Sequence, residues 1–324
     1  QSVNRLSSMR PACCVSETWP MIKVVVVGDF HTALAVHAER LPRPYQSVPG
    51  TGFTSAGDGR GTVQAIAAAR LGAEVTFIGR VGTDLHAQTA HQLFEKENVN
   101  CEFLVRDHSA PTGVDLTFRD PEGKWMSAYA PGANARLSAS DVERGKSAIA
   151  AAAVLVTQPG APQAAVKRAL ELAREQGVRS VFKPTHFADL DVEPILLADV
   201  VTPNEETLRE MALHVNLQDA PQAQITVCTL GPKGAQYFRR DDAGEMQTDR
   251  VAGFQKRPVD VTGAGDVFSV ALAVALAEGQ ALTDAIRFAN AAGALSVTVR
   301  GSVAGAPSRA AVDALLATVG TKTI

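Results

Sequence analysis

Residues 260–266 read Asp-Val-Thr-Gly-Ala-Gly-Asp and join a turn of small residues to a carboxylate. The apolar run that follows predicts a helix over residues 265–278, so the start of this helix adjoins the turn residues Gly263, Ala264 and Gly265. Backbone N–H groups at a helix N-terminus attract anions, and residues without bulk let a phosphate approach them closely. Asp266, beside that anion site, could accept a proton from an alcohol. The motif indicates phosphoryl transfer to a hydroxyl group, although a turn of this kind can also simply cap a helix.

The elements that must position this turn alternate along the chain. Short apolar, β-branched runs predict strands over residues 22–27, 75–78, 154–157, 180–183, 200–201 and 225–230. Helical patterns, several of them ended by glycine, predict helices over residues 61–71, 86–96, 163–176, 204–212, 265–278 and 282–296. Strands alternating with helices imply right-handed crossovers. The predicted fold is α/β, with a mostly parallel sheet covered by helices on both faces.

Residues 33–57 and 112–130 break this alternation. Polar and apolar residues alternate there between Pro and Gly turns, and Asp-Pro-Glu-Gly at residues 120–123 separates two such runs as in a hairpin. We expect both stretches to form a small β-sheet lid that projects from the α/β body. Residues 21–324 would then form one domain with a lid, preceded by an extension at residues 1–20 that is not part of the fold.

Composition argues against several classes of partner. Among 324 residues the net charge is −3 and no basic run stands out, so we expect neither a nucleic-acid nor a membrane partner. No apolar run is long enough to span a bilayer, and residues 1–20 lack the apolar core of a signal peptide, so we expect a cytoplasmic protein. The spacing of the cysteines fits neither a zinc site nor a disulfide framework; they are Cys13, Cys14, Cys101 and Cys228.

From about residue 22 to 310 the chain resembles the ribokinase-like, or PfkB, family of carbohydrate kinases. Residues 260–266 match the second signature of that family. Further segments agree with the family in order and spacing, at residues 67–73, 79–84, 131–134, 202–206, 229–235 and 289–294. The resemblance implies a Rossmann-like α/β body, a β lid over the acceptor, MgATP as the phosphoryl donor and homodimers formed through the lid.

The resemblance also implies roles for individual residues. Asp266 would be the catalytic base, and residues 263–265 would form the anion hole. The nucleotide would be held by Asn204, Thr229, Gly231, Gly234 and Asn290. Thr207 stands where the family orders Mg²⁺ with a glutamate, and the adjacent Glu206 could serve instead. Asp260 would be a natural ligand for a monovalent cation such as K⁺.

The acceptor side departs from the family pattern. Three positions at which ribokinases carry polar sugar contacts are here Ala33, Val63 and Gly160. A site built to bind hydroxyls depends on such groups, so the sequence disfavours plain D-ribose as the acceptor. The remaining candidates for acceptor contacts are Gly59, Gly61, Gln64, Asp29, Arg60, Asp58 and His31. Of these, Asp29 and Asp58 can equally be turn residues, and a lone histidine in a loop is more often solvated.

Lys183 is a further departure, on the donor side, where many relatives have Asn or Asp before a proline. A lysine there could bind a phosphate as a point charge, or it could be a solvated residue at the end of a strand.

We therefore predict an ATP-dependent kinase that transfers the γ-phosphoryl group to a hydroxyl of a sugar or nucleoside. The alternative is a ligand-binding or regulatory protein that keeps the fold with little kinase activity. The lost sugar contacts motivate this alternative, whereas the retained Asp266 argues against it, because a binding protein has no need of a base.

Overall fold

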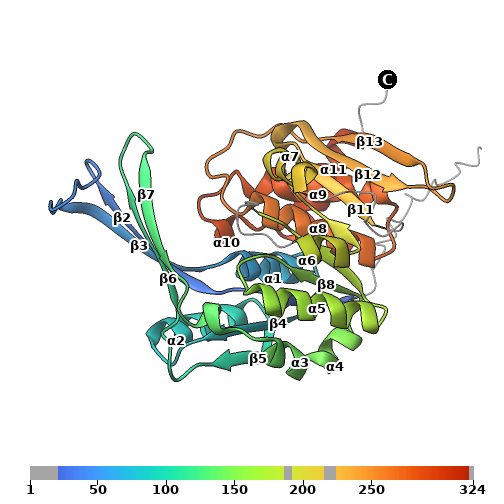
Figure 1. Cartoon of the computed structure of the whole chain (residues 1–324). Coiled ribbons are helices and arrows are strands. Elements are labelled where there is room, and N and C mark those ends of the chain that lie inside the picture. Colours follow the sequence, from blue (N-terminus) through green and yellow to red (C-terminus); the bar gives the residue numbers. More distant parts are fainter. Residues whose placement is uncertain (1–20, 186–191, 215–223, 321–324) are drawn as a thin grey trace, which may run out of the picture.

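The computed structural model describes residues 21–185, 192–214 and 224–320 of the chain (Figure 1). At its centre lies β1 (Lys23–Val27), whose four valines are buried on both faces of a sheet. Such an all-apolar strand is typical of a parallel sheet with helices on both sides. β1 pairs in parallel with β4 (Glu74–Val81) on one side and with β8 (Val154–Thr157) on the other.

Nine strands form the larger sheet in the order β13-β12-β11-β10-β9-β8-β1-β4-β5. Its remaining strands are β5 (Val99–Arg106), β9 (Arg179–Phe182), β10 (Val200–Val201), β11 (Ile225–Thr229), β12 (Gly234–Arg240) and β13 (Met246–Ala252). All pairs are parallel except β11 with β12 and β12 with β13. The predicted α/β fold with a mostly parallel sheet is confirmed.

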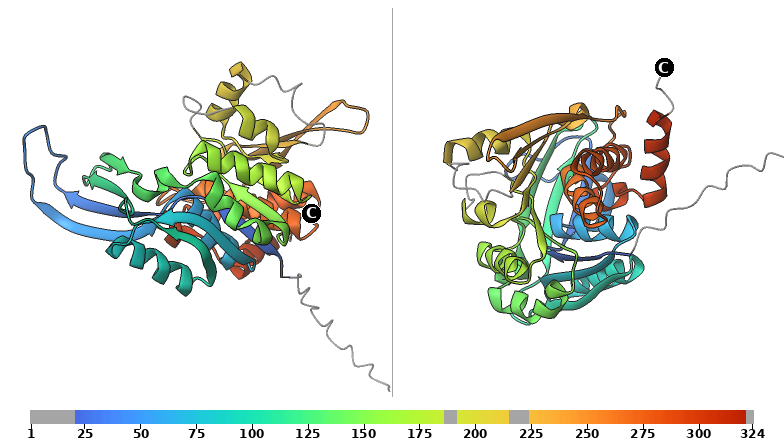
Figure 2. Two further views of the ribbon diagram at one scale, coloured as in Figure 1. Left: turned by 60° about the horizontal axis from the view of Figure 1, so that its bottom comes forward. Right: turned by 90° about the vertical axis from the view of Figure 1, so that its right-hand side faces the viewer.

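Helices cover both faces of this sheet (Figure 2). Val24 and Val26 face a core shared with α1 (Arg60–Arg70), α2 (Leu85–Lys96), α8 (Ala264–Ala277), α9 (Leu282–Ser296), α10 (Ser302–Gly305) and α11 (Arg309–Gly320). Val25 and Val27 face a second core shared with α3 (Ala139–Arg144), α4 (Lys146–Ala150), α5 (Gln163–Glu175), α6 (Val192–Leu197) and α7 (Glu205–His214). The described residues also include two short 3₁₀ turns, η1 (Gly132–Arg136) and η3 (Gly231–Lys233).

A separate four-stranded sheet projects from one side of the α/β body (Figure 1). Its order is β3-β2-β6-β7, made of β2 (His31–Ala38), β3 (Gly50–Asp58), β6 (Gly113–Arg119) and β7 (Trp125–Ala130). The two expected lid segments thus form one sheet, and residues 120–123 are its hairpin turn, as predicted. The expected extension, residues 1–20, lies outside the described residues. No helix among the described residues has the length and apolar character needed to cross a membrane.

Several elements were not predicted, chiefly β5, β12 and β13. These strands lie at or near the two edges of the large sheet, and β13 is exposed along almost its whole length. An edge strand with a solvated face carries polar residues, so it lacks the continuous apolar run by which buried parallel strands are predicted.

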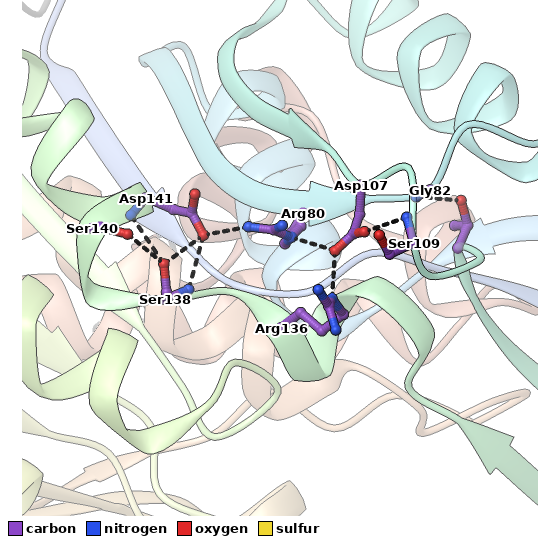
Figure 3. Close-up of polar contacts among 9 residues, drawn as sticks. Arg80, Gly82, Asp107, Ser109, Arg136, Ser138, Ser140 and Asp141 are labelled. Carbon is purple, nitrogen blue, oxygen red and sulfur yellow. Dashed lines mark hydrogen bonds and ion pairs between the residues drawn. The ribbon is translucent and has the colours of Figure 1, made fainter.

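A polar network fixes the base of the lid to the body (Figure 3). Arg80, near the end of β4, donates hydrogen bonds of 2.8 Å to both Asp107 and Asp141, and Arg136 donates a third, of 2.7 Å, to Asp107. The Ser109 N–H and the two guanidinium groups hold the pKa of Asp107 well below its usual range. The network joins the ends of β4 and β5 to η1 and α3, immediately beside the segment that leads into β6.

We predict that Arg80→Leu destabilises the chain, because Asp141 loses its cation and Asp107 keeps only one of its two. The melting temperature should fall by roughly 3–8 °C. Arg144→Leu is the matched control, since Arg144 lies exposed on α3 and should leave the melting temperature nearly unchanged. Equal melting temperatures for the Arg80 and Arg144 variants would show that the network does not stabilise the fold.

Candidate active site

The turn at residues 263–265 begins α8 as the sequence predicts. Gly263 adopts the left-handed conformation, with φ 78°, and is the N-cap of the helix. A Cβ at this position would lie 3.0 Å from Ser302 and 3.4 Å from Val63, so both conformation and space favour glycine. Among the described residues, none accepts a hydrogen bond from the N–H of Gly263 or Gly265. These two N–H groups are therefore available to an anion.

Asp266 is buried in the first turn of α8, with 6% of its surface exposed. Its Oδ1 atom lies 3.4 Å from the Lys183 ammonium and accepts a 3.3 Å hydrogen bond from Gln64 Nε2. Burial raises the pKa of Asp266, and the positive charges of Lys183 and Arg60 oppose that rise. No described residue donates a hydrogen bond to Oδ2, which leaves this oxygen available to a ligand.

Lys183 follows β9 and is not solvated, since only 14% of its side chain is exposed. Its aliphatic stem passes over Gly265, where an added Cβ would lie 3.0 Å from Lys183 Cε. Glycine at position 265 thus gives the lysine room to reach Asp266.

A cavity of about 700 Å³ opens in front of Asp266; we call it the turn cavity. The residues that line it include Gly263, Gly265, Asp266, Lys183, Asn204, Glu206, Thr229 and Gly231. From the lid side its walls include Asp58, Gly59, Arg60, His31 and Asp115. Residues at the start of α1, after β9, at the start of α7 and at the start of α8 therefore meet at one cavity.

A second cavity, of about 470 Å³, lies beside α9 and is called the α9 cavity. It shares Thr229, Gly231 and Gly265 with the turn cavity and is also lined by Gly234 and Asn290. Its further walls are largely apolar and include Phe254, Val261, Phe268, Ala294 and Val297. Asn290 Nδ2 donates to the carbonyls of Val251 and Ala252 at 3.1 and 3.2 Å, which fixes α9 against the end of β13.

A third cavity, of about 520 Å³, lies under the lid and is called the lid cavity. It shares His31, Arg60, Asp115 and Thr185 with the turn cavity. Its other walls include Asp29, Tyr129, Gly160, Val166 and Phe182. The three cavities are contiguous, and Asp266 lies in the middle one.

Not every predicted acceptor contact reaches a cavity wall. Gly61 packs against the end of β1, where a Cβ would lie 2.7 Å from Gly28 Cα, and Gln64 is buried behind Asp266. Gly59 and Arg60 do line the turn cavity. These positions follow from the close packing of the α1 N-terminus on β1, which the motif alone does not reveal.

Asp29 is buried and largely occupied by the protein itself. Its Oδ1 accepts hydrogen bonds from Gly61 N at 3.0 Å and Gln158 Nε2 at 3.1 Å, and its Oδ2 lies 3.6 Å from His31 Nδ1. Burial disfavours charge on both partners, yet their mutual attraction prevails, lowering the pKa of Asp29 and raising that of His31. A Cβ at Gly160 would collide with the Asp29 carboxylate, which accounts for the missing side chain at that position.

The two candidate metal residues occupy different settings. Glu206 is exposed on the wall of the turn cavity, close to Asn204, whose Oδ1 caps α7 by accepting from Thr207 N at 2.7 Å. Asp260 lies outside the cavities and accepts 3.0 Å hydrogen bonds from Thr262 N and Gly301 N. Among the described residues no three His, Cys, Asp or Glu side chains cluster as a metal site.

Two residues of this region, Asp115 and Ser302, were not found from the sequence. Ser302 donates a 2.6 Å hydrogen bond to Asp58 Oδ1, which ties the lid strand β3 to α10 beside Gly263. Asp115 lies in an alternating lid strand, and alternation assigns residues to two faces without saying which face covers the cavity.

Comparison with known proteins supports the motif analysis. The profile of the pfkB family carbohydrate kinases matches residues 21–309. The chain is 30% identical over 298 residues to the ribokinase of Haemophilus influenzae, an alignment that covers 88% of this chain and 95% of that enzyme. It is also 30% identical over 302 residues to the ribokinase of Bacillus subtilis, covering 91% of this chain and all, 100%, of that enzyme.

Among solved structures, the ribokinase of Arabidopsis thaliana complexed with ribose and ATP superposes with a TM-score of 0.79. The identity is 25%, and the match covers 91% of this chain and 99% of that one. These relatives are enzymes by name and give no support to the alternative of a regulatory binding protein. With a family profile matched over most of its length, the chain belongs to the pfkB family of carbohydrate kinases.

Proposed function

We propose that Asp266 is the general base of an ATP-dependent kinase whose acceptor is a hydroxyl of a sugar or nucleoside bound under the lid. The observation that carries this proposal is the position of Asp266. It is buried at the N-terminus of α8, with Oδ2 unoccupied by protein donors, in the middle of three contiguous cavities. Donor and acceptor in the flanking cavities would meet in front of this carboxylate.

The transfer follows from this arrangement. The acceptor hydroxyl gives its proton to Asp266 Oδ2 as its oxygen bonds to the γ-phosphorus of ATP. The bond from that phosphorus to the bridging oxygen breaks, and its electrons leave with ADP. The N–H groups of Gly263 and Gly265 stabilise charge on the transferred phosphoryl group, whereas the N–H of Ala264, also expected in the anion hole, already donates to the carbonyl of Val261 at 3.3 Å. Lys183, whose Nζ lies 3.4 Å from Asp266 Oδ1, adds a positive charge at the same place.

The α9 cavity suits the nucleotide. Its apolar walls would hold the adenine, with Asn290 near the adenosine, and Thr229, Gly231 and Gly234 would follow the phosphates toward the turn cavity. Asn204 also lines the turn cavity.

Mg²⁺ would neutralise the charge of the phosphates when bound, and a carboxylate on the cavity wall is the ligand it prefers. Glu206 is our candidate for that role. Asp260 is our candidate for a monovalent cation such as K⁺, because a carboxylate that accepts two backbone hydrogen bonds still has lone pairs left.

For the acceptor we retain Asp29, Gly59 and Arg60, which line the lid cavity or the turn cavity. Gly61 and Gln64 would act indirectly, through their hydrogen bonds to Asp29 and Asp266. We also propose a homodimer formed through the lid. The lid face that points away from the cavities carries exposed apolar side chains, namely Phe53, Leu116, Phe118 and Met126. Such a patch is typical of a protein interface. A cytoplasmic location stays a prediction.

We predict that Asp266→Asn lowers kcat by roughly 10²–10⁴, because the amide cannot accept the hydroxyl proton. The nucleotide affinity should change little, since Asp266 is not a nucleotide contact. Asp284→Asn is the matched control, as Asp284 lies exposed in the first turn of the neighbouring helix α9. Steady-state assays with MgATP measure the effect, and a kcat for Asp266→Asn equal to that of the control would rule out this base.

We also predict that MgATP stabilises the chain, by about 2.7 kcal/mol at a concentration of 100 times Kd. Ala294→Phe should abolish this stabilisation, because the added ring would fill the α9 cavity. Ala314→Phe, on the exposed face of α11, should retain it. Thermal unfolding with and without MgATP gives the comparison, and a stabilisation that survives in Ala294→Phe would place the nucleotide elsewhere.

A further inference from the structure

Several buried polar atoms in the described part of the chain have no hydrogen-bond partner, and they gather near the lid. They are His31 Nδ1, Thr32 Oγ1, Gln64 Oε1 and Asp115 Oδ1. Buried polar atoms are ordinarily hydrogen-bonded, because leaving them unpaired is unfavourable. Of these residues, His31 and Asp115 line both the turn cavity and the lid cavity. Unpaired atoms at this junction indicate that a ligand binds between the lid and Asp266.

His31 already has a neighbour in Asp29, at 3.6 Å. Asp115 lies near enough to His31 to help raise the pKa of that imidazole, but no described Lys, Arg or His lies within ion-pair distance of its carboxylate, and no described group donates a hydrogen bond to its Oδ1. An ionised carboxylate only accepts hydrogen bonds. The ligand group it calls for is therefore a donor, such as a hydroxyl.

The strand register explains why Asp115 faces the cavities. In β6, Asp115 pairs with Ala33 of β2 on one side and with Tyr129 of β7 on the other. Residues paired across neighbouring strands point to the same face of a sheet, so this row of three shares one face. Tyr129 and Asp115 both line the lid cavity, so the row lies on the face of the lid that points toward the cavities.

This register also bears on Ala33, the partner of Asp115 in β2. The family resemblance places a polar sugar contact where this chain has Ala33, and the structure places a carboxylate, that of Asp115, on the neighbouring strand of the same row. Neighbouring strands lie only about 4.7–4.9 Å apart, and side chains paired across them stand side by side. A carboxylate on Asp115 can therefore reach much the same part of the cavity as one at position 33.

We propose that Asp115 binds the acceptor, with Oδ1 accepting a hydrogen bond from a hydroxyl of an uncharged, polyhydroxylated sugar or the sugar of a nucleoside. This inference rests on the proposed function, in which the lid cavity holds the acceptor. Arg60 and His31 line the lid cavity as well, but the row itself carries only the Asp115 carboxylate, which repels an anion, so a phosphorylated sugar is the disfavoured class.

The test compares variants on the acceptor that the wild-type chain phosphorylates fastest. The panel is D-ribose, other pentoses and hexoses, their phosphate esters, and the nucleosides inosine and adenosine. We expect an uncharged acceptor to be fastest. Asp115→Ala should then raise the acceptor KM roughly ten- to a hundredfold, the effect of losing one hydrogen bond to a charged group. The KM for ATP should not change, and kcat should change little.

A second variant separates binding from folding. Asp115→Ala combined with Ala33→Asp moves the carboxylate to the neighbouring strand and should recover much of the lost acceptor affinity. Glu122→Ala is the control, because it removes an exposed carboxylate at the lid hairpin, away from the cavities. MgATP should stabilise all three variants as it does the wild type, which shows that they are folded.

Three results would overturn the inference: an acceptor KM for Asp115→Ala equal to that of Glu122→Ala, a double variant as weak as the single one, or a phosphate ester as the fastest acceptor. These results are distinct from failure of the proposed function. That failure would appear as turnover that survives in Asp266→Asn, whatever the behaviour of Asp115.

Discussion

In the mechanism proposed above, the site depends on keeping a carboxylate buried and ionised at the N-terminus of a helix. Burial favours the neutral acid, so Asp266 needs nearby positive charge and hydrogen-bond donors to act as a base. The Lys183 ammonium and the Gln64 amide supply these at Oδ1 and leave Oδ2 to the acceptor. Three elements, α1, β9 and α8, must therefore converge within a few ångströms. Gly265 makes this possible, because the lysine stem occupies the space of a missing side chain.

The two sheets position different parts of the site. The large sheet and its helices hold the turn and the α9 cavity, whereas the small sheet closes the other side with His31 and Asp115. The lid is joined to the body by the Arg80 network at its base and by the hydrogen bond from Ser302 to Asp58. The second link lies beside Gly263, so the position of the lid and the shape of the turn at residues 263–265 are physically connected.

Local sequence patterns were enough to predict the parallel α/β body, the lid segments and the helix that begins at the 260–266 motif. They were not enough to predict β12 and β13, because polar residues on the exposed faces of these strands interrupt the apolar run. Nor could they choose between a solvated and a buried Lys183, because its partner lies 83 positions away in the sequence, at Asp266. Asp115 was missed for the same reason, because its place beside the cavities follows from its pairing with Ala33 on the neighbouring strand. Residues whose role depends on such long-range register become visible only in the folded chain.

The pH dependence of kcat/KM for ATP at saturating acceptor, which reports groups of the enzyme–acceptor complex that binds ATP, tests the central interaction most directly. Transfer requires ionised Asp266, so activity falls as the pH drops through its pKa. Burial raises that pKa and the Lys183 ammonium lowers it, so removing the ammonium must raise it further. With saturating acceptor, we predict that the acid limb of Lys183→Met lies at higher pH than that of the wild type, while Lys183→Arg stays close to the wild type. An acid limb for Lys183→Met at the wild-type pH, or below it, would contradict the coupling of Lys183 to the base.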